Sequence, residues 1–259
     1  MIEAPMPTFD VPDNQPPQVL VPWGWRDVGK AIFLLIVGTF VLGALTVGYT
    51  LYTDTVVDPS EGMTAAPLFW LGALVYVVVI LAVYLFAVRR ANGDWALLGF
   101  RGFSLWWLPL IPVLAVVELM GMSIINLVLV LPFTGGTFEN PQVEALTGGS
   151  AMSARGFGLL LILVAVIAPI AEELFFRGML YPLLRQRRSA KVAIVLNGFV
   201  FALIHFIPLL IPGLFFVGMV LAWVRERSGS IIPCILLHAA QNSIVLFSLY
   251  AMSNGMIPQ

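Results

Sequence analysis

Charged residues are scarce in this sequence: only 10% of its 259 residues are Asp, Glu, Lys or Arg, whereas 60% are hydrophobic. An average soluble domain contains about 25% charged residues. So much apolar surface cannot be hidden inside one soluble fold of this size, and a disordered chain needs low hydrophobicity and high charge. The composition therefore predicts an all-α protein, a polytopic bundle of transmembrane helices that forms a single domain.

The sequence also contains only one cysteine and has almost no net charge. The single cysteine, Cys234, excludes an intrachain disulfide bond and a cysteine-based metal cluster. The formal net charge of −1 provides no basic field that would favour a nucleic-acid partner. A secretory signal peptide starts with basic residues that an apolar stretch follows at once. The first 30 residues are instead acidic and rich in proline, so we expect a tail outside the bilayer and an uncleaved first span.

Long hydrophobic runs make up most of the remaining chain. A helix needs about 20 apolar residues to cross a bilayer. Single runs of at least this length cover residues 31–51, 68–88, 105–131, 156–184 and 231–252. The run 192–224 contains Pro208 and Pro212, which interrupt helical hydrogen bonding, so two short spans joined at 208–213 fit better than one. The sequence thus predicts about seven spans, with eight as the upper estimate.

The basic residues of the predicted loops are distributed very unevenly. Eleven of the thirteen lysines and arginines lie in the N-terminal tail and in the loops 89–104, 185–191 and 225–227. The opposite loops contain one basic residue, Arg155, and the carboxylates Asp54, Asp58, Glu61, Glu139 and Glu144. By the positive-inside rule, the N-terminus lies in the cytoplasm and the C-terminus outside. We expect a multi-pass protein of a bacterial cell membrane.

Six ionisable side chains are predicted at membrane depth, where such groups are costly and are functional candidates by default. They are Glu118, Glu172, Glu173, Arg177, His205 and His238. At the rise of an α-helix, Glu172, His205 and Asn242 each lie about 20 Å from the basic end of their spans. This shared depth predicts one polar chamber that contains a carboxylate, an imidazole and an amide. Glu118 is expected in a supporting role, either bonded to one of these residues or lining the chamber.

Helical spacing separates the roles of the two adjacent carboxylates. Glu173 and Arg177 are four residues apart, so they can pair on one helical face and form a mainly structural ion pair. Glu172 is turned by about 100° from Glu173 and has no cation in its own helix. A carboxylate in an apolar site is a competent general base. His238 and Asn242 are also four residues apart and project from one face of the last span.

Three short motifs resemble those of the CPBP intramembrane protease family, which contains the type II CAAX prenyl endopeptidases and the bacterial Abi proteins. EELFFR at 172–177 resembles E-E-x-x-x-R, FALIH at 201–205 resembles F-x-x-x-H, and HAAQN at 238–242 resembles H-x-x-x-N. The resemblance implies a helical fold with about eight helices, a cavity open toward the cytoplasm and peptide-bond hydrolysis within the membrane.

The resemblance also implies how the chain is organised into a protease core and accessory segments. Residues 156–252 form the expected CPBP/Abi-like protease core, with spans four to seven. A cytoplasmic proline-rich tail, 1–30, and three accessory spans, 31–155, precede the core, and a short tail, 253–259, follows it.

The resemblance further implies that Glu172 and His205 activate a water molecule and that His238 and Asn242 stabilise the oxyanion. Amide hydrolysis needs these groups: a base for the water and donors for the developing negative charge. A zinc-dependent alternative uses Glu172, His205 and His238 as ligands with an open fourth position. We favour the mechanism without a metal cofactor, since the chain lacks an H-E-x-x-H pair.

Two other kinds of function compete with an intramembrane endopeptidase. A non-catalytic binding protein of the bacteriocin-immunity type would have no need for Glu172, His205 and Asn242 together. An ion-coupled or proton-coupled transporter usually has repeated halves, which this sequence lacks. The expected partners of the endopeptidase are the lipid bilayer and a membrane-associated peptide or protein substrate. In a bacterium, such a substrate is favoured over a prenylated CAAX protein.

Overall fold

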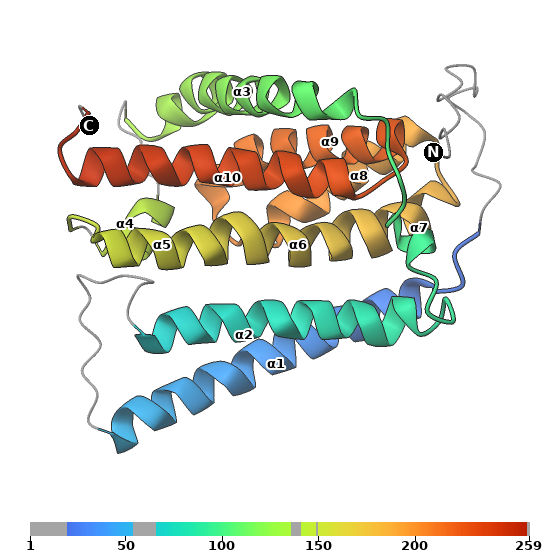
Figure 1. The fold of residues 1–259 in the computed structure, drawn as a ribbon, viewed down its shortest axis with the longest axis horizontal. Helices are drawn as coiled ribbons and strands as arrows, with labels where there is room; N and C mark the ends of the chain where they lie inside the picture. The colour runs from blue at the N-terminus through green and yellow to red at the C-terminus, as the bar shows by residue number, and fades with distance from the viewer. Residues whose placement is uncertain (1–19, 54–65, 136–140, 149, 258–259) are drawn as a thin grey trace.

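The computed structural model describes residues 20–53, 66–135, 141–148 and 150–257, and this part of the chain is helical throughout, without strands (Figure 1). Its α-helices are α1 Trp25–Tyr52, α2 Ala66–Val83, α3 Trp107–Ile125, α4 Pro141–Thr147, α5 Ala154–Ile162, α6 Ala168–Glu173, α7 Tyr181–Arg185, α8 Ala190–Leu203, α9 Ile211–Ser228 and α10 Ile232–Ser253. In this part of the chain, six helical stretches are long and apolar enough to cross a membrane. The chain is therefore a multi-pass membrane protein, as its composition predicts.

α1 begins before the first predicted span, within the tail expected over 1–30. Residues 1–19 of that tail lie outside the described residues, but the helix already starts at Trp25. The reason is a cap: Asp27 accepts a hydrogen bond from the backbone N–H of Gly24 at 3.0 Å, and a carboxylate stabilises a helix N-terminus. Asp27 also pairs with Arg90 at 3.1 Å, which ties the start of α1 to the chain beyond α2.

α5, α6 and α7 form one continuous helix, Ala154–Arg185, because wide π-helical turns join them. Each wide turn ends two residues before a proline: one ends at Ile167, before Pro169, and the other at Leu180, before Pro182. Proline has no N–H and its ring crowds the carbonyl four residues earlier, so the preceding turn widens. The EELFFR motif lies between these two prolines.

The run 192–224 forms two helices, α8 and α9, but the break falls earlier than 208–213. α8 ends at Leu203, and the chain turns before α9 starts at Ile211. Pro208 and Pro212 occupy first turns of helices, where a missing N–H costs nothing. With 14 residues, α8 is about 21 Å long, shorter than the hydrocarbon core of about 30 Å. In the described chain, α8 and the six long stretches give seven apolar helices.

α8 and α9 touch backbone to backbone. A Cβ atom added at Gly218 would lie 2.8 Å from the Cα of Gly198, which is closer than side-chain carbons approach. Small residues allow such close contact between membrane helices. The contact holds the carbonyl of Gly218 toward the protein centre, where it accepts a hydrogen bond from Arg177 at 2.8 Å.

The long helices alternate in direction, so the loops gather at two ends of the bundle (Figure 1). We call one end the basic end: it contains the start of α1 and residues 89–106, 185–191 and 225–231. The opposite end contains α4, residues 204–210 and the end of α10. Of the acidic residues expected at the opposite end, Asp54, Asp58, Glu61 and Glu139 lie outside the described residues.

Candidate active site

A cavity of about 500 Å³ lies inside the bundle, and all four residues predicted as catalytic line it: Glu172, His205, His238 and Asn242. Glu172 comes from α6, His205 from the turn after α8, and the other two from α10. The remaining lining side chains are mostly apolar. The structure thus brings together, in one chamber, polar groups that are up to 70 positions apart in the sequence.

Glu172 has two oxygens in different surroundings. Its Oε1 accepts a hydrogen bond from the hydroxyl of Tyr76 at 3.3 Å. Its Oε2 has no hydrogen-bond partner among the described residues and lies 4.0 Å from Nε2 of His238. The side chain is 18% exposed, but Oε2 is itself buried, so Tyr76 fixes one oxygen while the other lies beside His238 without a hydrogen bond among the described residues.

Glu173 faces away from the cavity and is fully buried. Its Oε1 accepts a hydrogen bond from Nη1 of Arg177 at 2.7 Å and lies 3.0 Å from Nδ1 of His238. An ionised carboxylate only accepts hydrogen bonds, so Nδ1 of His238 carries a hydrogen. Glu173 therefore sets the orientation of the imidazole and directs its Nε2 toward Glu172.

His205 occupies a different position from the one expected for a partner of Glu172. Its Nδ1 lies 2.7 Å from the backbone carbonyl of Phe201, which requires a hydrogen on that nitrogen. Among the described hydrogen bonds and ion pairs, none joins His205 to Glu172, whereas His238 lies within 4.0 Å of it. The phenyl ring of Phe201 packs near both imidazoles, with centroid distances of 4.8 Å to His205 and 5.9 Å to His238.

Asn242 is held by a carbonyl that a proline leaves free. In the wide turn before Pro169, the N–H of Ala168 bonds to the carbonyl of Leu163, five residues earlier. The carbonyl of Val164 would take its bond from residue 169, which has no N–H because it is proline. Nδ2 of Asn242 donates to this carbonyl at 2.8 Å, and its second amide hydrogen remains available.

The second proline has the same effect on the other side of the motif. The N–H of Tyr181 bonds to the carbonyl of Phe176, so the carbonyl of Arg177 would need an N–H from Pro182. Nε of Arg225, from α9, donates to it instead at 3.1 Å. The prolines of the continuous helix therefore create two acceptors through which α9 and α10 are joined to it.

The residues named for a zinc site do not form a metal-ligand cluster. Within the described chain, no three His, Cys, Asp or Glu side chains converge closely enough to hold a metal ion. His205 is turned to a backbone carbonyl, and His238 has one nitrogen against Glu173. Glu172, His205 and His238 therefore share a cavity without the geometry of a zinc site.

Glu118 takes neither of the positions expected for it. Its side chain is fully buried in α3, it does not line the cavity, and its oxygens have no hydrogen-bond partner among the described residues. It lies within electrostatic range of Arg177 and Glu173. Any influence on the site must therefore pass through that ion pair.

Residues 154–244 match the family described as Type II CAAX prenyl endopeptidase Rce1-like. This stretch runs from α5 into α10 and contains all three motifs together with Glu172, His205, His238 and Asn242. The chain carries a domain of this protease family. No curated protein and no solved structure matches the chain. The CAAX endopeptidase family implies an intramembrane protease with a protein substrate.

Tyr76 is a site residue that the sequence analysis missed. It lies in α2, outside the stretch that matches the CAAX endopeptidase family, and it lines the cavity. The sequence does contain a signal, because its hydroxyl falls in the middle of an otherwise apolar span. That signal is weak, since tyrosine packs in membrane helices as readily as it bonds there.

The cavity lies in the half of the bundle away from the basic end, and its lining extends to Leu146, Ile207 and Leu249 near the opposite end. The resemblance implies a cavity open toward the cytoplasm, and the loop charges place the basic end in the cytoplasm. Both expectations remain predictions.

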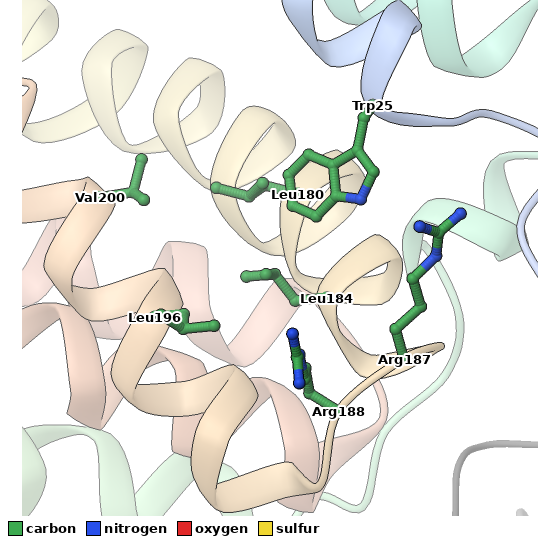
Figure 2. Close-up of a pocket in the computed structure, with 7 residues that line it drawn as sticks. All are labelled: Trp25, Leu180, Leu184, Arg187, Arg188, Leu196 and Val200. Atoms are coloured by element: carbon green, nitrogen blue, oxygen red, sulfur yellow. The ribbon is translucent and has the colours of Figure 1, made fainter.

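A second, smaller cavity of about 320 Å³ lies at the basic end, as Figure 2 shows. Arg187 and Arg188 border it from the turn after α7, and Trp25 borders it from the start of α1. Leu180 also lines it, eight residues or about 12 Å along the helix from Glu172. This cavity contains none of the predicted catalytic residues.

Proposed function

We propose that the protein hydrolyses a peptide bond of a membrane-associated protein or peptide, with Glu172 as the general base. The main support for this proposal is that the two oxygens of this carboxylate have different surroundings. Tyr76 holds one of them, and the other is buried beside His238 without a hydrogen-bond partner among the described residues, in a side chain that lines the cavity. A carboxylate held in this way can accept a proton from a bound water molecule while the remaining hydroxide attacks the peptide carbonyl.

His238 is the imidazole that we assign to proton transfer beside Glu172. Its Nε2 lies 4.0 Å from Glu172, a separation that is too long for a direct hydrogen bond but that one water molecule can bridge. The proton taken from water then passes to the departing amine, either from Glu172 directly or through this imidazole. Glu173 and Arg177 act through His238, because their buried pair fixes the ring and does not itself line the cavity.

We assign to Asn242 the stabilisation of the negative charge that develops on the oxygen of the peptide carbonyl. One amide hydrogen is used on the carbonyl of Val164, and this bond fixes the side chain so that the second hydrogen is directed without reorganisation. His205 lines the same cavity from the opposing turn and is the second candidate donor. No step in this mechanism requires a metal ion.

The apolar lining of the cavity suits an uncharged, hydrophobic peptide segment. Besides Glu172, His205 and His238, the described lining side chains carry no ionisable group other than the hydroxyl of Tyr76. A charged substrate side chain would lose its hydration there without gaining a partner. We therefore assign the substrate to apolar segments of membrane proteins or membrane peptides.

The test is the substitution Glu172→Gln, which keeps shape and hydrogen-bonding reach but removes the base. The membrane proteome of cells that produce this variant should accumulate a protein or peptide that the wild type removes. Glu144→Gln is the matched control, because Glu144 is an exposed acidic residue outside the cavity. Yield and thermal stability in detergent should be similar for all three proteins.

Retained processing by a folded Glu172→Gln protein would refute the assignment of the base. A cellular effect that survives in this variant would instead support a non-catalytic binding protein. Incubation of the purified wild type with a strong chelator provides a separate readout. Activity should persist, and a loss that added zinc restores would support the zinc-dependent alternative.

A further inference from the structure

We propose that the smaller cavity, at the basic end, is a binding site for one anionic phospholipid. Arg187 and Arg188 hold the phosphate, and the first part of one acyl chain lies between α7 and α8. The inference does not depend on the proposed function, because this cavity contains none of the catalytic residues. Its volume of about 320 Å³ lies at the lower end of the range for small-molecule sites, which suits a phosphate group and the start of a chain.

The guanidinium groups of Arg187 and Arg188 are the charged part of this cavity. Both side chains are exposed, and neither guanidinium group makes a hydrogen bond or an ion pair with another described residue. Glu226, which pairs with the end of α7, is already occupied, because it accepts hydrogen bonds from Tyr181 at 2.8 Å and from Arg185 at 3.0 Å. Guanidinium groups bind phosphate through paired, charge-assisted hydrogen bonds. The described lining residues include no carboxylate, so a net negative ligand is favoured over a zwitterionic one.

Two pairs of aliphatic side chains form most of the remaining wall. On the continuous helix, Leu180 and Leu184 are four residues apart and therefore project from one face. On α8, Leu196 and Val200 have the same spacing. Each pair extends about 6 Å along its helix, and α7 packs against α8, so the two rows form a short apolar groove beside the arginines (Figure 2). The pair on the continuous helix is buried, whereas Leu196 is 37% exposed, so the groove is open along α8. A hydrocarbon chain fits such a groove, and a soluble anion has no use for it.

The tryptophans indicate that this cavity lies at the headgroup level of the membrane. Trp25 borders it from the start of α1 and is 46% exposed. Tryptophan is enriched where headgroups meet hydrocarbon, and basic residues near a membrane surface attract anionic lipids. The basic end, or a position within two residues of it, contains six of the seven tryptophans: Trp23, Trp25, Trp95, Trp106, Trp107 and Trp223. The arginines and the groove thus lie where the phosphate and the acyl chains of a lipid meet.

Hydrogen bonds fix the borders of the cavity relative to one another. Nε1 of Trp23 donates to the carbonyl of Met179 at 2.9 Å, and Nε2 of Gln186 donates to the carbonyl of Val21 at 3.2 Å. These bonds join the chain before α1 to the continuous helix, so Trp25 is held beside the turn that carries the arginines. A preformed site loses less conformational entropy on binding. A lipid bound there contacts α1 and α8 together and stabilises the folded protein.

Lipid binding is measured on the purified full chain in a nonionic detergent. Phosphatidylglycerol, phosphatidylcholine or inorganic phosphate is added at equal concentration, native mass spectrometry counts the bound molecules, and thermal unfolding gives Tm. We expect one tightly bound phosphatidylglycerol with a rise in Tm, weaker binding of phosphatidylcholine and no effect of phosphate. Equal binding of the two lipids would overturn the preference for an anionic lipid. A rise in Tm with phosphate alone would overturn the lipid assignment in favour of a site for a soluble anion.

The double variant Arg187→Gln/Arg188→Gln tests the phosphate position. It should weaken phosphatidylglycerol binding about tenfold or more, because it removes charge-assisted hydrogen bonds to the phosphate. Arg89→Gln/Arg227→Gln is the matched control, since it removes the same charge from exposed positions of the basic end outside the cavity. It should bind the lipid as the wild type does. Unchanged binding in the first variant would overturn the site, and so would an equal loss in both variants, because the attraction would then be diffuse.

Leu196→Trp tests the groove while both arginines remain. The larger ring fills the space between α7 and α8, so phosphatidylglycerol binding should fall several-fold. Leu203→Trp is the control, at a position of α8 that is 43% exposed and lies outside the cavity. Unchanged binding in Leu196→Trp would overturn the position of the acyl chain. The two tests change different residues, so one remains decisive if the other variant does not fold, and neither depends on proteolysis.

Discussion

Among single side chains, two neighbouring glutamates have opposite surroundings. Glu172 lines the cavity and has one buried oxygen without a hydrogen bond among the described residues, whereas Glu173 is fully buried and shares one oxygen between Arg177 and His238. One step along a helix turns a side chain by about 100°, which is enough to separate a cavity-lining group from an interior one. The adjacent pair can therefore combine a base with the structural anchor of its neighbouring imidazole.

Tyr76 leads to a prediction about the orientation of the base. The substitution Tyr76→Phe removes only the hydroxyl, so Glu172 loses the bond that fixes Oε1 but keeps the packing of the ring. We expect kcat to fall about ten- to hundredfold, as for the loss of one hydrogen bond of about 1.5–3 kcal/mol to a charged group, with little change in KM. Steady-state cleavage of the substrate found by the membrane proteome comparison provides the measurement.

Tyr84→Phe is the matched control for this substitution, since Tyr84 continues the same helical stretch but is 46% exposed and lies outside the cavity. It should be as active as the wild type. Equal activity of Tyr76→Phe and Tyr84→Phe would show that Glu172 is held well enough without the phenol.

Along the helices, the decisive feature is the pair of prolines that flank the EELFFR motif. Each removes a backbone N–H and leaves a carbonyl that a side chain of another helix uses: Asn242 at Val164 and Arg225 at Arg177. Polar groups inside a membrane must find partners within the protein. The same backbone irregularity that widens the helix therefore supplies the bonds that position α9 and α10 around the site.

The contact between α8 and α9 can be tested through its glycines. In Gly218→Ala, the new Cβ would lie 2.8 Å from the backbone of Gly198, so the helices must separate. We expect a loss of about 1–3 kcal/mol in the free energy of unfolding. The carbonyl of Gly218, which accepts a bond from Arg177, would move as well. Thermal unfolding in detergent should show a lower Tm than for Gly158→Ala, where no atom lies within 4 Å of the new Cβ. Equal stability of the two variants would contradict tight contact between the helices.

The helices could be predicted from the sequence where apolar runs are uninterrupted, and less well where prolines occur. The run 156–184 becomes the continuous helix Ala154–Arg185, because a long apolar segment in a membrane has to satisfy its own backbone. The break between α8 and α9 falls earlier than the prolines predict, since Pro208 and Pro212 start helical turns instead of ending them. Proline alone does not distinguish these two positions.

For the protein as a whole, the motif residues could be assigned to one chamber because their depths agree, and the cavity contains all four of them. The partners of each residue depend on rotation and packing, which the sequence pattern does not determine. Tyr76 reaches Glu172 only because α2 packs against α6, and His238 lies nearer to Glu172 than the expected His205 does.

The ion pair at the centre of the bundle leads to a prediction about overall stability. In Arg177→Met, the buried carboxylate of Glu173 loses the cation that compensates it, so the free energy of unfolding should fall by about 3–5 kcal/mol. The double variant Glu173→Gln/Arg177→Met removes both charges and should regain part of that loss. Thermal unfolding in detergent measures both, with Arg89→Met, at an exposed position of the basic end, as the control. If the double variant were no more stable than Arg177→Met, the contacts of the guanidinium with Gly218 and the ring of Phe201 would explain its importance better than charge pairing does.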